Sequence, residues 1–509
     1  DMLDSGIVTK LISDNFSLNQ GRYNASKSTL FNLPKPNFTL RYALEMSLQD
    51  RLLYQGVAAY LIQHFDACLN WKVFSHRYQS DGPSARTLFK PHVESWKGFI
   101  GGVKASLVPG TVLVTTDIAN YYENIETARL ADTFRTLLPE LPAAPDTKSQ
   151  LRDCLERLFE WLSDWSFSSV RGLPQNRDAS SFLANIYMVP VDRAVIDSGN
   201  DYFRYMDDIK IVCPDLPSAR RVLKLLILSL RDRGLSVNAA KTAILEANDP
   251  DVSKHLTELS PSIQALDAMW NTRSRWPILR SLPLLRKEIL ALIVAKQTHS
   301  KDFRFCIRRL IWLAGCKDMP VPADFFAEVS EELINNLETA PASTDEFVEY
   351  LAVAPLTDNH LELLIKYLIN PNLRIYTWQD YRLWLVLLRH GKRDSRLVDA
   401  ARTLITAGLD TAARAGATLY LGRFGTTSER MVAVEQFKTL TSFLGQRCAI
   451  IGIHEVSYES GIKQFVAKHV RADLKGVYAH LQQSKGLYIS ALEALPITKF
   501  VDQGATFAS

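Results

Sequence analysis

Residues 202–213 of the chain read YFRYMDDIKIVC. On each side of the aspartate pair, Asp207 and Asp208, apolar side chains recur at every second position. A period of two is the pattern of a β-strand with one buried face. The segment therefore predicts a β-hairpin that carries two carboxylates at its tip.

An aspartate pair at a turn also has a simple structural explanation, because Asp tolerates turn geometry and is well solvated there. A second segment favours a catalytic role over this simple explanation. Residues 112–125 read VLVTTDIANYYENI, and their first part predicts a β-branched strand that ends in Asp117. If this strand lies beside the hairpin, three carboxylates converge, and they repel one another unless cations lie among them. Such hard oxygen ligands suit Mg²⁺. Two ions roughly 3.5–4 Å apart can catalyse in-line phosphoryl displacement, so the pattern predicts nucleotidyl transfer.

Four segments, taken in order, resemble motifs of the reverse transcriptases. Tyr205–Asp208 resembles their catalytic tetrad, and Asp117–Ile125 resembles the strand and turn that carry their first catalytic aspartate. Residues 172–187, GLPQNRDASSFLANIY, are similar to the loop and helix that support template and incoming nucleotide. Residues 234–242, GLSVNAAKT, are similar to the palm segment that ends in a lysine near the triphosphate. The order of the four predicts a right-hand polymerase palm and a nucleotidyltransferase.

The resemblance implies a set of catalytic residues and metal ligands. Asp117, Asp207 and Asp208 are the expected catalytic aspartates, and with Ile118 they are the expected ligands of two Mg²⁺ ions, Mn²⁺ being the alternative metal. Lys241 is the fourth expected catalytic residue, because an ammonium there can neutralise or protonate the leaving pyrophosphate. A lysine at the surface that is merely solvated remains the alternative.

Substrate contacts are expected from Tyr122, Gln175 and Tyr205. Tyr122 stands five positions after Asp117, where the resemblance places an aromatic ring beneath the sugar. Such a ring would clash with a 2′-hydroxyl, which implies deoxynucleotides as substrates. A tyrosine buried in the palm core is the alternative. Gln175 would help to order the substrate.

Arg77 is the fourth expected substrate contact. It lies in residues 71–110, where basic side chains are interleaved with aromatic ones. Such a mixture can grip a phosphate backbone and stack on bases, although an ordinary, partly buried surface gives the same pattern. Two positions of the 172–187 loop depart from the family: Asn176 replaces a usual Gly and Ser181 a usual Pro. A side chain at the first position hinders close approach of a nucleic-acid strand, so altered handling of the template is expected.

The rest of the chain is expected to be mainly helical. Leucines four positions apart predict a helix that begins at Leu40 and continues towards Leu69. Beyond residue 256 strand patterns cease, and amphipathic helical segments follow one another; residues 409–425 resemble one helix of a HEAT-type repeat, without an exact recurring period. The predicted fold is an α+β polymerase palm and fingers followed by an all-α, HEAT-like helical domain. The expected domains are a mostly helical N-terminal and fingers region at 1–110, the palm at 111–255 and the helical domain at 256–509.

The amino-acid composition indicates the broad class of protein to which the chain belongs. A chain of 509 residues with 47% hydrophobic content can bury large cores. No run of about eighteen apolar residues and no signal pattern occurs, so a cytoplasmic protein without membrane contact is expected. The six cysteines lack a metal-ligand spacing and are expected to be reduced. Residues 111–255 are net acidic and their flanks net basic, which suits an acidic centre between phosphate-binding surfaces.

The combination of an atypical template loop and a large helical domain most resembles the bacterial abortive-infection reverse transcriptases, a group that defends against phage. This resemblance implies DNA synthesis from dNTPs without a template, primed by a protein hydroxyl, with single-stranded DNA product attached to the protein, and assembly as a homo-oligomer. Two alternatives stay open. One is an RNA-templated reverse transcriptase that makes a defined cDNA, and the other is a catalytically idle palm that acts as a scaffold.

Overall fold

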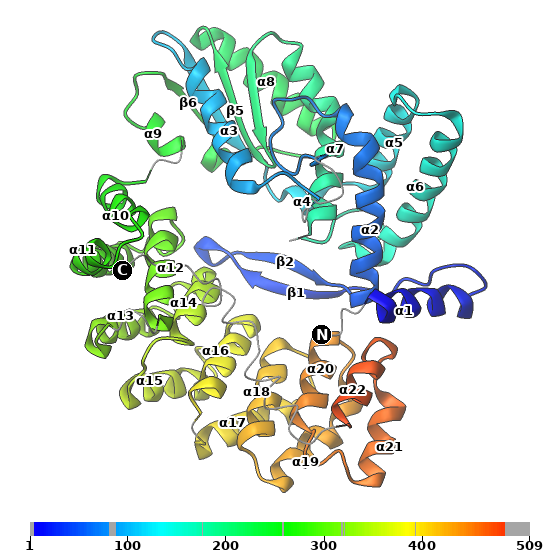
Figure 1. The fold of residues 1–509 in the computed structure, drawn as a ribbon, viewed down its shortest axis with the longest axis vertical. Helices are drawn as coiled ribbons and strands as arrows, with labels where there is room; N and C mark the ends of the chain where they lie inside the picture. Colours follow the sequence, from blue (N-terminus) through cyan, green and yellow to red (C-terminus); the bar gives the residue numbers. More distant parts are fainter. Residues whose placement is uncertain are drawn as a thin grey trace. The chain divides into compact units, whose positions relative to one another are not determined.

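The computed structural model describes residues 5–80, 88–175, 177–256, 259–316, 319, 321–391 and 393–483 (Figure 1). Contacts divide the chain into two compact units. Unit 1 comprises Asp1–Leu30 and Ala43–Glu258, and unit 2 comprises Phe31–Tyr42 and Leu259–Ser509.

Unit 1 is built around a four-stranded antiparallel sheet in the order β4-β5-β3-β6. The strands are β3 (Val112–Asp117), β4 (Asp201–Tyr205), β5 (Asp208–Cys213) and β6 (Ala243–Glu246). The predicted hairpin is confirmed as β4 and β5, and Met206 takes a left-handed conformation in its turn, with φ +56°. The β3 strand pairs with β5, so that Asp117 lies opposite Asp208.

Both faces of this sheet are covered, whereas the alternating pattern had predicted one buried face. In β5 every residue after Asp208 is buried. Helices α7 (Asp178–Ile196) and α8 (Leu216–Asp232) pack against one face, and α3 (His92–Ser106) packs against β4 and β5. The aromatic residue Phe203 joins a small core with Phe99 of α3 on that second face. The one-face prediction was wrong because α3, which precedes the sheet in the chain, supplies a second apolar layer.

Of the described helices of unit 1, α3, α7 and α8 contact the sheet, whereas α1 lies away from it at the end of α2 (Figure 1). The described helices of this unit are α1 (Ser5–Leu18), α2 (Leu48–Phe65), α3 (His92–Ser106), α4 (Tyr121–Asn124), α5 (Thr127–Leu137), α6 (Pro145–Trp165), α7 (Asp178–Ile196), α8 (Leu216–Asp232) and α9 (Val252–His255).

The helix expected to begin at Leu40 was wrong for its first residues. The strand β2 (Leu40–Glu45) pairs with β1 (Thr29–Pro34), and α2 begins only at Leu48. Leu40, Tyr42 and Leu44 also alternate, and the last two are buried. The Ser47 side chain accepts a hydrogen bond from the amide of Asp50 at 3.1 Å. This N-cap fixes where α2 starts.

The part of unit 2 that follows residue 259 is helical, which confirms a mostly helical C-terminal part. Each helix from α11 to α18 contacts the helix two places further along, so that odd-numbered and even-numbered helices form two rows. Gly422 and Gly452 let α18 and α20 approach closely, because a Cβ at Gly422 would lie 2.5 Å from the Cα of Gly452. The helices are α10 (Pro261–Asn271), α11 (Arg275–Val294), α12 (Lys301–Gly315), α13 (Ala323–Asn335), α14 (Thr344–Leu351), α15 (Asp358–Ile369), α16 (Thr377–His390), α17 (Ser395–Thr406), α18 (Ala412–Phe424), α19 (Thr427–Glu435), α20 (Phe443–Gly452), α21 (Ser460–His469) and α22 (Lys475–Leu481).

Among the helices that the structure describes in either unit, none combines the length and the apolar character needed to cross a bilayer.

Candidate active site

The three expected aspartates meet at one end of the sheet. Asp117 is the last residue of β3, Asp207 lies in the β4–β5 turn, and Asp208 opens β5. The amide of Ile118 donates to the carbonyl of Asp207 at 3.2 Å. This main-chain bond holds the turn against the end of β3, so the strand pairing itself brings the carboxylates together.

The carboxyl groups of Asp117 and Asp207 lie close enough for each to act on the ionisation of the other. Burial, and then the charge of Asp117, raises the pKa of Asp207 to about 7. Asp208 is directed elsewhere, because its Oδ1 lies 2.8 Å from Nζ of Lys210. The Lys210 side chain is only 3% exposed. The site therefore contains a close carboxyl pair and a third carboxylate that a buried ammonium already neutralises.

Lys241 reaches the same place from the segment before β6. The amide of Asn238 donates to the carbonyl of Asp117 at 2.7 Å, and the amide of Ala119 donates to the carbonyl of Ser236 at 2.8 Å. This pairing brings Nζ of Lys241 to 2.5 Å from Oδ2 of Asp117. Burial opposes the charge of Lys241, but the bond to Asp117 and the nearby carboxylates outweigh it and raise its pKa.

Tyr122 lies on the short helix α4, which follows a left-handed Asn120 with φ +45°. Its hydroxyl is 2.9 Å from Oγ of Ser181 on α7. Burial raises the pKa of Tyr122 to about 12, and Asp207 is among the charges that act on it. The tyrosine is thus held neutral, with a fixed ring, close to the carboxyl pair.

Residues 62–275 match a family model described as reverse transcriptase (RNA-dependent DNA polymerase). These residues form a reverse transcriptase domain. The chain is therefore a nucleotidyltransferase of the RNA-directed DNA polymerase class. Such a domain acts on nucleotides and nucleic acid. The match also confirms the expected fold of this part of the chain as like the palm and fingers of a reverse transcriptase.

Solved structures similar to the chain include two telomerases. Telomerase from Candida albicans, in complex with a fragment of telomeric RNA, aligns with 11% identity and a TM-score of 0.32, over 94% of this chain and 69% of the telomerase chain. Apo telomerase from Candida tropicalis aligns with 12% identity and a TM-score of 0.33, over 94% and 74% of the two chains. No curated protein sequence matches the chain.

Reverse transcriptase domains typically use divalent metal ions. The carboxyl groups of Asp117 and Asp207 are suitable ligands for such an ion. Asp117 and Asp207 offer hard oxygen donors. The two carboxyl groups are largely shielded from solvent, so they repel one another when both are ionised. In this structure a cation, the ammonium of Lys241, already lies against Asp117. Its side chain is 65% exposed, so it can swing away and leave that oxygen to a metal ion.

The loop of residues 172–175 is fastened to the segment that carries Tyr122. The amide of Leu173 donates to the carbonyl of Tyr122 at 3.0 Å, and the amide of Gly172 donates to the carbonyl of Ile125 at 2.9 Å. Gly172 has φ +93°, a conformation that glycine adopts without strain. Gln175 follows, half-buried, whereas Asn176 lies outside the described residues.

Tyr205 and Arg77 make contacts with residues other than the carboxyl pair. The ring of Tyr205 packs against Trp96 of α3, with centroids 4.9 Å apart. Arg77 donates from Nε and Nη2 to the two carboxylate oxygens of Asp66, at 2.9 and 3.0 Å, and from Nη1 to the carbonyl of Val73. The guanidinium thus fastens the segment after α2. The substrate roles of both residues stay predictions that this arrangement does not favour.

Sequence reasoning missed a buried polar group beneath the hairpin turn. Arg204 donates to Asp192 and to Oδ1 of Asn185, both on α7, and to the carbonyl of Met206. Lys210 was missed as well. One signal was present, because Asp192 and Asn185 stand among mostly apolar residues in a helix that is buried over most of its length. Buried polar residues of this kind require partners.

Proposed function

We propose that the reverse transcriptase domain joins deoxynucleotides by two-metal nucleotidyl transfer, with Mg²⁺ as the metal. The observation that carries the proposal is the pairing of β3 with β5 and the bond from the amide of Ile118 to the carbonyl of Asp207, which bring Asp117, Asp207 and Asp208 to one end of the sheet. Asp117, Ile118, Asp207 and Asp208 would hold the ions. When bound, the ions activate the attacking 3′ oxygen and stabilise the leaving oxygen.

The chain's own residues bind and orient the nucleotide in this proposal. Lys241 leaves Asp117 and meets the triphosphate, where its ammonium offsets the charge of the departing pyrophosphate. The Tyr122 ring lies under the sugar and excludes a 2′-hydroxyl. Its orientation is supported by the contacts of its hydroxyl with Ser181 and of its carbonyl with Leu173. Lys210 holds the Asp208 side chain in place through a short ion pair.

The finer proposal is untemplated, protein-primed DNA synthesis in abortive-infection defence against phage. It rests on the sequence resemblance: Asn176 and Ser181 replace residues of the usual template loop, and a large helical part follows the palm. In this proposal the product is single-stranded DNA attached to the protein, and the protein assembles as a homo-oligomer. The two rows of helices in unit 2 agree with a HEAT-like array, and the three domains at 1–110, 111–255 and 256–509 belong to the same proposal.

A second candidate is an RNA-templated reverse transcriptase that makes a defined cDNA. The observation in its favour is the family match itself, because that family copies RNA. A catalytically idle scaffold is less favoured, because all three acidic residues of the expected site are present and meet at one end of the sheet.

The deciding experiment incubates the purified chain with Mg²⁺ and each labelled dNTP, with and without template, and resolves the products on denaturing gels before and after protease. Product that forms without template and migrates with protein until digestion supports the finer proposal. Product that requires RNA template supports the second candidate. Asp207→Ala should abolish either product, while Asp232→Ala, an exposed aspartate at the end of α8, should leave it unchanged.

The role in defence is tested in cells challenged with phage. Asp207→Ala combined with Asp208→Ala should remove protection while the protein accumulates to its normal level. Protection that survives this double substitution would reject the catalytic account in favour of the scaffold.

A further inference from the structure

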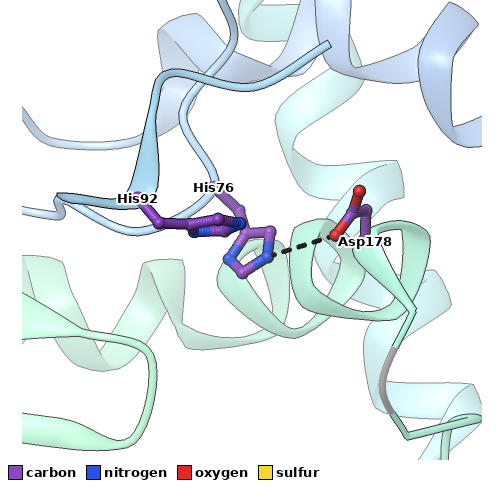
Figure 2. A group of neighbouring side chains, drawn as sticks. All are labelled: His76, His92 and Asp178. Atoms are coloured by element: carbon purple, nitrogen blue, oxygen red, sulfur yellow. Dashed lines mark ion pairs between the residues drawn. The ribbon is translucent and has the colours of Figure 1, made fainter. Parts of the chain in front are cut away.

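Three side chains from distant parts of unit 1 form a compact group of metal-ligand type. His76 lies in the segment before α3, His92 is the first residue of α3, and Asp178 is the first residue of α7. One ligand atom from each lies within 4.8 Å of the other two (Figure 2). We propose that this group binds a divalent transition-metal ion, with Zn²⁺ as the ion it fits best. The proposal does not depend on the polymerase activity.

The spacing of the group suits a metal better than a direct bond. Nε2 of His76 lies 3.6 Å from Oδ1 of Asp178, which is too long for a good hydrogen bond. Two ligands of a tetrahedral zinc ion, each about 2.0–2.1 Å from the metal, are roughly 3.4 Å apart. The rings of His76 and His92 have centroids 5.0 Å apart, so small rotations about the side-chain bonds can bring the third ligand to the same ion.

His76 has the supporting contact that zinc-binding histidines usually have. Its Nδ1 is 2.6 Å from Oγ of Ser75, and Ser75 is fully buried, with its carbonyl accepting a hydrogen bond from Nδ2 of Asn185 at 2.7 Å. A histidine ligand typically donates its second ring N–H to such a fixed acceptor, which orients the ring and leaves the other nitrogen for the metal. Here Nδ1–H can donate to Ser75, and Nε2 faces Asp178.

The backbone at His76 gives an independent sign of constraint. Its φ is +49°, in the left-handed region, where a non-glycine residue is held only if its surroundings fix it. Strained conformations of this kind concentrate at functional sites. In this case the strain places the imidazole opposite Asp178.

The chemistry of the donors selects the class of ion. Two imidazoles and one carboxylate suit zinc and related transition metals, whereas Mg²⁺ prefers all-oxygen ligands. The Asp178 side chain is 55% exposed and that of His76 only 12%. The group therefore opens to solvent on one side, which provides an entry path and room for a water as fourth ligand.

The position of the group links it to the palm. The hydroxyl of Tyr205 lies 3.5 Å from Nδ1 of His92, and Tyr205 ends the strand that leads to Asp207. Asp178 stands one helical turn before Ser181, the partner of Tyr122. An ion here would tie α3 and α7 together beside the hairpin and should stabilise unit 1.

The test is calorimetric titration of the chelator-treated full chain with ZnCl₂, repeated with MgCl₂. One Zn²⁺ ion should bind per chain, and Mg²⁺ should not compete for it. His92→Gln and Asp178→Asn should each weaken Zn²⁺ binding by at least about tenfold. His299→Gln, at an exposed histidine of unit 2, should have no effect. Asp207→Asn should also leave Zn²⁺ binding unchanged, which separates this group from the carboxyl pair.

Zinc should also raise the melting temperature of the wild-type chain, but not that of Asp178→Asn. Circular dichroism checks that each variant is folded, and Asp178→Asn keeps the size of the side chain if His92→Gln does not fold. The proposal is overturned if the wild-type chain binds no Zn²⁺, if both variants bind it as tightly as the wild type, or if only Asp207→Asn abolishes binding.

Discussion

Arg204 of β4 donates two parallel hydrogen bonds to Asp192 of α7, from Nε to Oδ1 at 2.8 Å and from Nη2 to Oδ2 at 2.7 Å. Their side chains are 0% and 3% exposed. The Asp192 carboxylate outweighs the effect of burial on Arg204 and raises the pKa of that guanidinium. Through Nη1 the same guanidinium donates to the carbonyl of Met206 at 3.0 Å. The ion pair thus fixes the main chain immediately before Asp207.

Breaking this pair should destabilise the palm and disorder the catalytic turn. Asp192→Asn leaves a buried guanidinium without its counter-charge, and removal of one partner of a buried pair costs about 3–5 kcal/mol. Thermal and urea unfolding of the full chain should show a loss of that order. Nucleotide incorporation, measured well below the melting temperature, should fall as well.

The same helix offers a matched control for this prediction. Arg193 pairs with Glu140 at 2.7 Å, but these side chains are 49% and 46% exposed. Exposed pairs contribute about 0–1 kcal/mol, so Arg193→Gln should change stability and incorporation little. Equal losses for Asp192→Asn and Arg193→Gln would contradict the positioning role assigned to the buried pair.

The two lysines of the site should respond differently to loss of charge. Lys241→Met removes an exposed ammonium from Asp117, so divalent ions no longer compete with it. We expect Mg²⁺ affinity without nucleotide to rise by about fivefold, in line with the small worth of an exposed pair, while incorporation falls because the triphosphate loses a cation. Titration with Mn²⁺, followed by electron paramagnetic resonance, measures the first effect, and single-turnover kinetics measure the second.

Lys210→Met provides the contrast. Lys210 is buried and holds Asp208 at 2.8 Å, so its removal leaves a partly buried carboxylate without a counter-charge. The expected result is a lower melting temperature, which Lys241→Met should not show. If Lys241→Met lowered the melting temperature as much as Lys210→Met, the distinction between a mobile and a fixed ammonium would be wrong.

The sequence sufficed for the hairpin and for the position of Asp117, because short strands with a period of two and acidic ends are local patterns. It failed at Leu40–Glu45, where leucines four apart fit a helix and alternation of Leu40, Tyr42 and Leu44 fits a strand equally well. Only pairing with β1 decides between them, and that contact is not local.

The buried contacts of the site show the same limit. Arg204 stands between Phe203 and Tyr205. Asp192 and Asn185 indicate that α7 contains buried polar residues in need of partners, but the sequence does not indicate that Arg204 is the partner. The second apolar layer from α3 is likewise a tertiary feature. The bond from Nδ2 of Asn185 to the carbonyl of Ser75 ties the segment of His76 to α7, the helix that begins at Asp178. Spacing in the sequence does not contain this relationship.

Tyr122 allows a test of sugar selection that separates the ring from its hydroxyl. Tyr122→Ala removes the proposed barrier to a 2′-hydroxyl, and the preference for dNTP over rNTP, measured as a ratio of kcat/KM values, should fall by about tenfold to a hundredfold. Tyr122→Phe keeps the ring and should keep the preference, at a cost of about 1 kcal/mol for the lost bond to Ser181. An unchanged preference in Tyr122→Ala would assign the residue to the core of the palm instead.

Asp380, in the first turn of α16, should make the stability of unit 2 depend on pH. The side chain is 3% exposed, and burial raises its pKa to about 7 against the opposing effect of Arg374. The unfolded chain has a pKa of about 3.9 at this residue. The folded state therefore keeps a proton that the unfolded state releases, so the contribution of Asp380 to stability is greatest below pH 4 and is lost as pH rises towards 7.

Asp380→Asn mimics the protonated form and should remove this dependence. The difference in the free energy of unfolding, variant minus wild type, should be about 2–3 kcal/mol larger at pH 8 than at pH 5. This magnitude follows from the separation of the folded and unfolded pKa values. Urea unfolding of the full chain at both pH values, followed by a probe in unit 2, measures the difference. Asp399→Asn, at an exposed position on α17, is the control, because this side chain stays in solvent when the chain folds. An equal effect of Asp380→Asn at pH 5 and pH 8 would show that the Asp380 carboxyl ionises in the folded protein as it does in the unfolded chain.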